Sequence, residues 1–362
     1  MRVLVTGATG YVGSRLVCAL VDRGDDVVVT SRRPDSLRRF GWYGRVTAIA
    51  MDAGDSESAH DAVARAGDID ALYFLVHGIG QQDFDEADTR AAHNVAVAAR
   101  AANVPRIVYL GGFVPDCDHD DLSRHLRSRA EVGAALDIPG GPDLVWLRAA
   151  VILGAGSTSF EIIRYVADRL AVIPQPGWVD NAMDPISVRD VIHYLVEVVD
   201  PTFPAGAYDI AGPDVGARYE SVLSEYIRAI RQPRLRLPVP FVNSHLAGRV
   251  TGMLVPVPSS LTADLVASLS QPMTASEHSI RGLVPEPPNG LIPMREAIES
   301  AVHTTSPRSV CALADPHHLA DTDPGWAGGD LMRIRRAVSG GIGSIVGFTT
   351  RRVRGVVSLL SG

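Results

Sequence analysis

Short apolar runs alternate with amphipathic helical stretches through the first half of the chain. Apolar runs of about four to eight residues, separated by helices of about ten or more, are typical of buried parallel strands joined by helical crossovers. The strands are expected in the segments RVLVT, DVVVTS, VTAIAMD, DALYFLV, RIVYLGG and LVWLRAAVILG. The pattern therefore predicts an α/β fold with a doubly wound parallel sheet.

After Gly154 this alternation loosens, and a smaller C-terminal lobe is expected. A helix is predicted over 158–170, and the strand–helix–strand pattern returns in PISVRDVIHYLVEVV and GAYDIAG. The segment 233–305 is rich in proline and short helices, as expected of a lobe that covers a cleft. We assign residues 1–155, completed by about 184–212, to the sheet domain, residues 156–183 and 213–305 to the substrate-side lobe, and residues 306–362 to a basic, glycine-rich tail.

The tail carries arginines and no acidic residue after Asp330. A basic, apolar segment suits an anionic membrane or partner surface, so peripheral membrane contact is one hypothesis. The alternative is a loosely packed tail, because its glycines weaken a continuous helix. The arginines are Arg333, Arg335, Arg336, Arg351, Arg352 and Arg354.

The composition mainly excludes certain partners and cellular locations. The formal net charge of -7 gives no sign of a nucleic-acid partner. Cys18, Cys117 and Cys311 are scattered in the sequence, which argues against a disulfide framework and for a reducing compartment. We expect no secretory leader before the first strand, and no apolar run reaches the roughly 20 residues that cross a bilayer. A cytoplasmic location is therefore expected. The sequence does not indicate which small molecule or protein is the partner, or which oligomeric state the protein adopts.

The segment VTGATGYVGSRLV places Gly7, Gly10 and Gly13 between the first strand and the first helix. Gly7 permits a sharp turn, Gly10 lets backbone N–H groups approach a pyrophosphate, and Gly13 lets the helix pack close to the sheet. The helix N-terminus attracts the anion. A glycine-rich turn without a ligand is the alternative, but strand, spacing and helix agree, so we predict an NAD(P)-binding Rossmann fold.

The end of the second strand indicates which dinucleotide is bound. An acidic residue there would hold the ribose hydroxyls of NAD, but the sequence has Ser31, Arg32 and Arg33. Arginine suits a 2′-phosphate through forked, charge-assisted hydrogen bonds, so NADP is favoured over NAD. Asp52 follows the third strand and either accepts from the adenine amino group or is a solvated loop residue. The expected cofactor-binding residues are Gly7, Thr9, Gly10, Tyr11, Val12, Gly13, Ser31, Arg32, Arg33, Asp52, Val76 and His77.

Four segments resemble the atypical, extended branch of the short-chain dehydrogenase/reductase superfamily. They are TGATGYVG, the MDAGD turn, the helix around Asn94 and PISVRDV. Two further segments are similar to a bacterial group of NAD(P)-binding proteins that often carries an extra C-terminal domain of unknown function. These segments are YFLVHGIG and LRAAVILGAGSTSFEIIRYVADRLAVIPQPGWV. The resemblance covers roughly residues 1–300. It implies that active enzymes of this kind reduce carbonyls with a serine, a tyrosine and a lysine.

The catalytic residues that this resemblance implies are absent. Gly111 and Gly112 lie where the serine is expected. His125 takes the place of the tyrosine and Arg129 that of the lysine, and the chain contains no lysine. A histidine near pKa 6.5 is a competent proton donor, although a neighbouring arginine favours its neutral form. A solvated basic face of the helix is the alternative reading of this pair.

His77 follows the fourth strand, where side chains face the cleft of a doubly wound sheet. It is expected near the ribose or nicotinamide, or else caps the strand end without a substrate role. His125, Arg129 and His77 are therefore the candidate catalytic residues.

The other histidines and cysteines give weaker indications of a functional site. Cys117 and His119 lie in an acidic loop without zinc-site spacing, so no metal is predicted. His317 and His318 are expected as a surface pair.

These features favour an NADP(H)-binding, oxidoreductase-like protein that acts by direct hydride transfer to a quinone or enone. A non-catalytic dinucleotide sensor or assembly subunit is the alternative, and a membrane-associated subunit docking through the tail is a third.

Overall fold

Seven parallel strands form one central sheet in the order β11-β6-β5-β4-β1-β2-β3. The computed structural model describes residues 1–78, 83–115, 117–118, 122–239, 244–303 and 306–330. The strands are β1 (Arg2–Thr6), β2 (Asp26–Ser31), β3 (Thr47–Ala50), β4 (Ala71–Phe74), β5 (Arg106–Gly112), β6 (Asp143–Ala149) and β11 (Gly206–Asp209). The predicted doubly wound α/β fold is confirmed.

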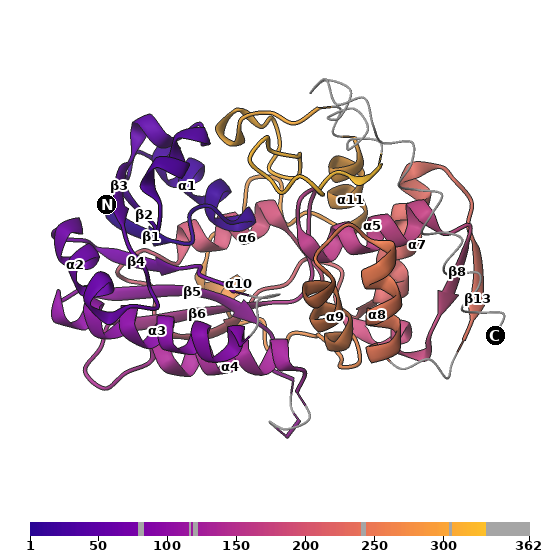
Figure 1. Cartoon of the computed structure of the whole chain (residues 1–362), viewed down its shortest axis with the longest axis horizontal. Coiled ribbons are helices and arrows are strands. Elements are labelled where there is room, and N and C mark those ends of the chain that lie inside the picture. The colour runs from indigo at the N-terminus through magenta and orange to yellow at the C-terminus, as the bar shows by residue number, and fades with distance from the viewer. Residues whose placement is uncertain (79–82, 116, 119–121, 240–243, 304–305, 331–362) are drawn as a thin grey trace.

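Helices cover both faces of this sheet (Figure 1). Val3 and Val5 of β1 pack with α1 (Tyr11–Arg23) and α6 (Val188–Glu197) on one face. Leu4, between them in the strand, packs on the other face, because successive strand residues point to opposite sides. That second face carries α2 (Ser56–Ala66), α3 (Phe84–Ala101) and α4 (Arg124–Leu136). Both faces are apolar, which explains the uninterrupted apolar runs.

The smaller lobe lies beyond the carboxyl ends of the strands (Figure 1). Its core contains Leu153, Phe160, Met183, Tyr226 and Ile298. Besides α6, the α-helices described after β6 are α5 (Thr158–Arg169), α7 (Tyr219–Ile230), α8 (Ser244–Leu254), α9 (Ser259–Ser268), α10 (Ile280–Leu283) and α11 (Met294–Val302). Two-stranded pairs join β7 (Ile152–Leu153) to β10 (Ile186–Ser187), β8 (Val172–Gln175) to β13 (Leu235–Pro238), and β9 (Ala182–Met183) to β12 (Ala217–Arg218).

The prediction of a single strand over LVWLRAAVILG is wrong. The structure divides this run into β6, which lies in the central sheet, and β7, which pairs with β10 outside it. The chain leaves the sheet after Ala149 to enter the lobe. An apolar run marks burial, and both strands are buried in different cores, so hydrophobicity alone does not reveal the break.

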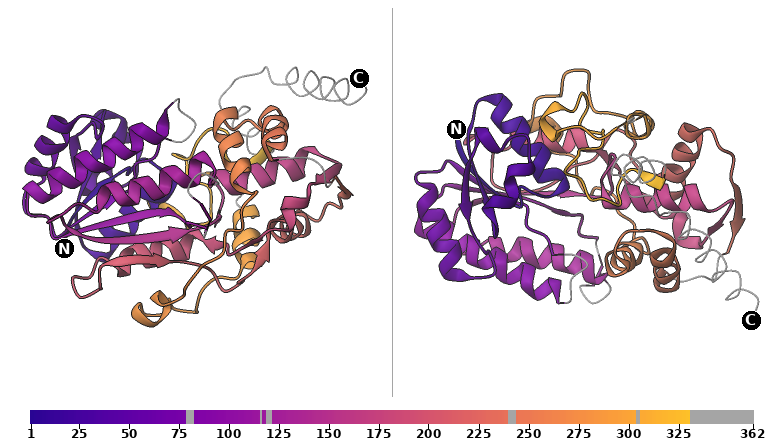
Figure 2. Two further views of the ribbon diagram at one scale, coloured as in Figure 1. Left: turned by 90° about the horizontal axis from the view of Figure 1, so that it is seen from below. Right: turned by 45° about the horizontal axis from the view of Figure 1, so that its top comes forward.

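Residues 306–330 are packed against both parts of the fold, although the sequence places them in the tail. Cys311 and Asp323 contact α1 of the sheet domain, whereas Trp326 and Asp330 contact α5 of the lobe. This segment includes a short 3-10 helix, Val310–Ala312, which lies against α1 (Figure 2). The arginines from Arg333 onward lie outside the described residues. Among the residues described, no helix is both long and apolar enough to span a membrane.

Candidate functional site

The turn between β1 and α1 has the geometry of a phosphate cradle. Gly7 has φ +72°, and a Cβ atom there would overlap the carbonyl oxygen of Leu75. A Cβ on Gly13 would overlap the carbonyl oxygen of Gly7, so the helix packs as closely on the turn as glycine allows. The N–H of Gly10 donates to the Gly7 carbonyl at 3.0 Å and closes the turn. The backbone thus needs glycine at the positions that a dinucleotide cradle requires.

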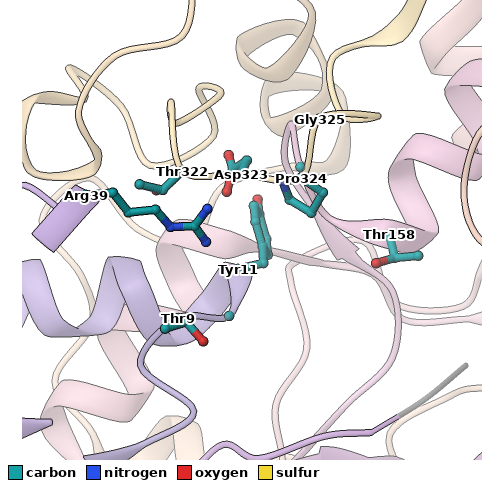
Figure 3. Close-up of a pocket in the computed structure, with 10 residues that line it drawn as sticks. Thr9, Tyr11, Arg39, Thr158, Thr322, Asp323, Pro324 and Gly325 are labelled. Atoms are coloured by element: carbon teal, nitrogen blue, oxygen red, sulfur yellow. The ribbon is translucent and has the colours of Figure 1, made fainter. Parts of the chain in front are cut away.

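A cavity of about 280 Å³ opens at this turn (Figure 3). Thr9, Gly10 and Tyr11 supply the cradle side, and the opposite wall comes from residues 322–325. The Arg39 guanidinium points toward Tyr11 across the cavity (Figure 3). The full lining is Thr9, Gly10, Tyr11, Arg39, Gly156, Thr158, Thr322, Asp323, Pro324 and Gly325.

Arg39 is a cradle residue that the sequence analysis missed. It ends the 3-10 helix Pro34–Arg39, which follows β2 directly. Arg32 and Arg33, the predicted phosphate ligands, are exposed and do not line this cavity. Ser31 accepts a hydrogen bond from the Arg33 N–H at 3.2 Å. A basic residue at the end of the helical turn after β2 was the available signal.

Asp52 is exposed at the end of β3 and holds its own turn. Its carboxylate accepts from the Gly54 N–H at 3.0 Å, and its N–H donates to Ser58 at 2.9 Å. Val12 is partly buried at the start of α1, and Val76 is partly buried after β4. These positions surround the carboxyl ends of β1, β3 and β4, where doubly wound folds bind ligands.

The wall at 322–325 is anchored to α1 by a buried arginine. Arg15 forms a forked pair with Asp323, with Nη1–Oδ1 at 3.0 Å and Nη2–Oδ2 at 2.8 Å. Its remaining N–H groups donate to the carbonyls of Pro316, His318 and Tyr11. No local pattern in the sequence links positions that far apart.

A disulfide between Cys18 of α1 and Cys311 fastens the same segment, so the prediction of unpaired cysteines is wrong. Sequence separation hid the pair, because the returning segment brings residue 311 onto α1. The surface assignment of His317 is also wrong: it is 1% exposed, and Asp315 accepts from its Nδ1 at 2.6 Å. Cys117 is free and exposed.

A second cluster lies at the ends of β4 and α4. Ser123 caps α4 by accepting from the Leu126 N–H at 3.3 Å, and the helix begins one residue before His125. Arg129 is 5% exposed and forms an ion pair with Asp88 of α3 at 2.8 Å. The same carboxylate accepts from Nδ1 of His77 at 3.1 Å. The structure therefore brings the three candidate catalytic residues together, since the His77 and His125 rings lie 5.5 Å apart.

Asp88 is a further residue that the sequence analysis missed. It occupies the apolar stripe of α3 together with Phe84, Ala91, Ala92 and Val95. A carboxylate at such a position must be paired if it is buried. That interruption of the stripe was a readable signal.

Both histidines are held neutral at this site. Withdrawal from water and the Arg129 charge lower the pKa of His77 to about 4, although 29% of its side chain stays exposed. Withdrawal from water, His77 and Arg129 lower the pKa of His125 well below its ordinary value. Nδ1 of His125 is buried with no hydrogen-bond partner among the described residues. The reading of this pair as a solvated basic face does not hold.

The two glycines in the place of the serine differ sharply. A Cβ on Gly111 would overlap Nε1 of Trp146 and approach Cε1 of Tyr109 at 2.9 Å. A Cβ on Gly112 would meet Cγ of Arg129 at 3.6 Å, an ordinary contact. Tyr109 lies in the same strand, β5, and its hydroxyl donates to the Arg129 carbonyl at 3.1 Å.

The described residues contain no group of three or more His, Cys, Asp or Glu able to hold a metal ion. His119 lies outside them.

The fold and the cradle are those of a Rossmann-type dinucleotide-binding domain, as in the atypical short-chain dehydrogenases/reductases that the sequence resembles. Residues 7–133 match the NAD(P)H-binding family. The predicted resemblance and NAD(P)-binding Rossmann fold are thereby confirmed.

Relatives and solved structures of several kinds are similar to the chain. The mitochondrial NADH dehydrogenase [ubiquinone] 1 alpha subcomplex subunit 9 of Arabidopsis thaliana is 25% identical over 293 residues, covering 76% of this chain and 71% of the relative. A nucleoside-diphosphate-sugar epimerase of Staphylococcus aureus has a TM-score of 0.62 at 16% identity, covering 83% of this chain and 100% of that one. The triphenylmethane reductase of Citrobacter sp., complexed with NADP(H), has a TM-score of 0.61 at 18% identity with the same coverage.

Proposed function

We propose that this protein binds NADP(H) and transfers hydride to an acceptor without a proton from a side chain. The carrying observation is the neutral cluster: Arg129 is engaged by Asp88, and both candidate histidines have lowered pKa values. The family's usual donor, a tyrosine beside a lysine, is missing. The site is therefore suited to reactions in which the acceptor needs no general acid.

Conjugated carbonyl compounds, such as quinones and enones, meet this requirement. The bound reduced nicotinamide would supply the hydride. The acceptor carbon or oxygen gains that hydride with its electron pair, the resulting negative charge spreads over the conjugated system, and water then supplies the proton. The reductase of Citrobacter sp., crystallised with NADP(H), is similar in fold and supports a reductive role.

The preference for NADP rests on arginine near the cradle. Arg32 and Arg33 are exposed at the end of β2, and Arg39 lines the cavity. Their guanidinium groups are free to swing toward a 2′-phosphate or a diphosphate. We infer that these side chains, not an acidic ribose ligand, select the dinucleotide.

The test is optical measurement of NADPH oxidation against quinones, enones and simple aldehydes. We expect turnover with the conjugated acceptors only, at a rate independent of pH between about 5.5 and 8, because the pKa values of His77 and His125 lie below this range. A general acid contributes roughly 10² to 10⁴ in rate. A loss of that size in His125→Gln, or a rate that falls with a pKa near 6.5, would contradict the proposal.

Dinucleotide choice is tested separately by titrating NADPH and NADH. We expect the Arg32→Ala/Arg33→Ala double variant to lose about tenfold in NADPH affinity and to keep its NADH affinity. Arg38→Ala is the matched control, since that side chain is 70% exposed beside Asp35. Tighter binding of NADH than NADPH by the unmodified protein would contradict the preference.

A non-catalytic dinucleotide sensor or assembly subunit is the second candidate. The Asp88–Arg129 pair satisfies its own charges, and a relative is named as a subunit of NADH dehydrogenase. On this proposal the protein binds NADPH and NADP⁺ with different affinities and oxidises NADPH with no acceptor. Calorimetric titration of both forms, beside the turnover assay, separates the two candidates.

A further inference from the structure

One buried carboxylate joins three elements at the carboxyl edge of the sheet. The Asp88 side chain on α3 is 4% exposed. It accepts from Arg129 of α4, from Nδ1 of His77, and from the Gly78 N–H at 2.9 Å. Helices α3 and α4 lie side by side along one face of the sheet (Figure 1). Asp88 therefore fixes the segment after β4 against both helices.

This pairing selects one tautomer of His77. A carboxylate paired with arginine only accepts hydrogen bonds, so the ring nitrogen facing Asp88 must carry the hydrogen. A neutral imidazole has a single N–H, and Nδ1 uses it. Nε2 of His77 is left as an acceptor, and it has no hydrogen-bond partner within the part of the chain that the structure describes.

The position of Nε2 suggests what it accepts from. His77 follows β4, which lies beside β1 and its cradle in the sheet. Of the groups on a dinucleotide, phosphates and carbonyls only accept, so a neutral acceptor suits a donor. The vicinal hydroxyls of a ribose are such donors, and the carboxamide N–H and the adenine amino group are the other two sources.

We propose that Asp88 is a positioning residue that holds His77 with Nε2 as the acceptor for a ribose hydroxyl of the bound dinucleotide. The inference rests on the proposed function for its ligand, but the tautomer is a property of the protein alone. Asp88 touches neither cofactor nor substrate and acts through His77. On this proposal His77 takes over the role that a lysine would have in holding the ribose.

The first measurement is the ¹⁵N spectrum of the histidine side chains in the full-length protein, with His77→Gln identifying the signals. We expect the Nδ1–H tautomer for His77 without ligand. We expect Arg129→Gln to keep this tautomer, since the Asp88–His77 contact survives, and Asp88→Asn to lose its dominance. Dominance of Nε2–H in the unmodified protein would overturn the proposal, even if Asp88→Asn does not fold.

The second measurement adds NADPH, or 2′-phospho-ADP-ribose, which has the ribose but no nicotinamide. A shift of the His77 Nε2 signal with both ligands is expected, together with about tenfold weaker NADPH binding by Asp88→Asn. Asp85→Asn is the matched control, because Asp85 also joins α3 to α4, through Arg124 at 2.6 Å, and is partly exposed. Its NADPH affinity should stay within about twofold.

The outcomes separate the two proposals. A shift with NADPH alone would assign the contact to the carboxamide and overturn the ribose assignment. NADPH binding that leaves the His77 signals unmoved would overturn this inference and leave the proposed function standing. Absence of any NADPH binding would overturn the proposed function and with it the ligand named here, while the tautomer result would still decide the role of Asp88.

Discussion

Arg15 and Asp323 form a forked ion pair across 308 positions of the chain, with both side chains 2% exposed. Arg15 lies on α1, one turn after the glycine cradle, and Asp323 lies in the opposite wall of the cavity. The pair therefore holds the two sides of the cavity at the cradle in one arrangement. Its geometry links the stability of the returning segment to the shape of the site.

Asp323→Ala should strongly destabilise the protein. The substitution leaves the Arg15 guanidinium buried without a carboxylate, which costs about 3–5 kcal/mol. Urea unfolding followed by circular dichroism measures this loss, and NADPH affinity should fall with it. Asp22→Ala is the control, since Asp22 also lies on α1 but pairs with Arg45 in solvent. Equal stability of the two variants would show that the buried pair has no such role.

Reduction of the Cys18–Cys311 disulfide should lower the thermal stability of the protein. A cross-link over this separation stabilises a fold by about 2–4 kcal/mol, chiefly by constraining the unfolded chain, which corresponds to a midpoint lower by about 4 °C. Calorimetry with and without a phosphine reductant measures the change, with Cys117→Ser as the control. A thiol assay in denaturant should find only Cys117 reactive before reduction, and reaction of all cysteines at that stage would contradict the pairing.

Gly111→Ala and Gly112→Ala should differ in stability. A methyl group on Gly111 meets the rings of Trp146 and Tyr109, and overpacking of this kind costs about 1–3 kcal/mol. The same group on Gly112 makes only ordinary contacts, so little change is expected. Denaturant midpoints of the two variants provide the comparison. A serine could thus be restored only at Gly112, and tolerance of Gly111→Ala would refute this account of the packing.

Stability should fall as the pH drops from about 6.5 to about 4. The pKa of His77 is about 4 in the folded protein and near 6.5 when unfolded, so the unfolded chain binds more protons in this window. The His77 contribution is full above about 6.5 and is lost toward about 4. His125 acts in the same direction, while Asp88 opposes and Arg129 reinforces the shift of His77. Urea midpoints of His77→Gln should show a shallower acid loss, and parallel curves would contradict the assignment.

Features of the site that depend on residues close together in the sequence could be predicted from the sequence. The cradle at Gly7, Gly10 and Gly13 is one example, since strand, turn and helix are consecutive and each glycine answers a local steric need. His77, His125 and Arg129 were also named in advance, because position after a strand or along a helix is a local property. Their pairing with Asp88 was not, although its place on the apolar stripe of α3 offered a signal.

The sequence by itself determined the alternation of strands and helices, and with it the doubly wound sheet, because side-chain periodicity records which face of each element is buried. Only the tertiary structure decided the cavity wall at Asp323, the Cys18–Cys311 bond and the carboxylate beside His77. These contacts join residues from distant parts of the chain. Whether two such residues meet depends on how the whole fold packs, and no local pattern carries that information.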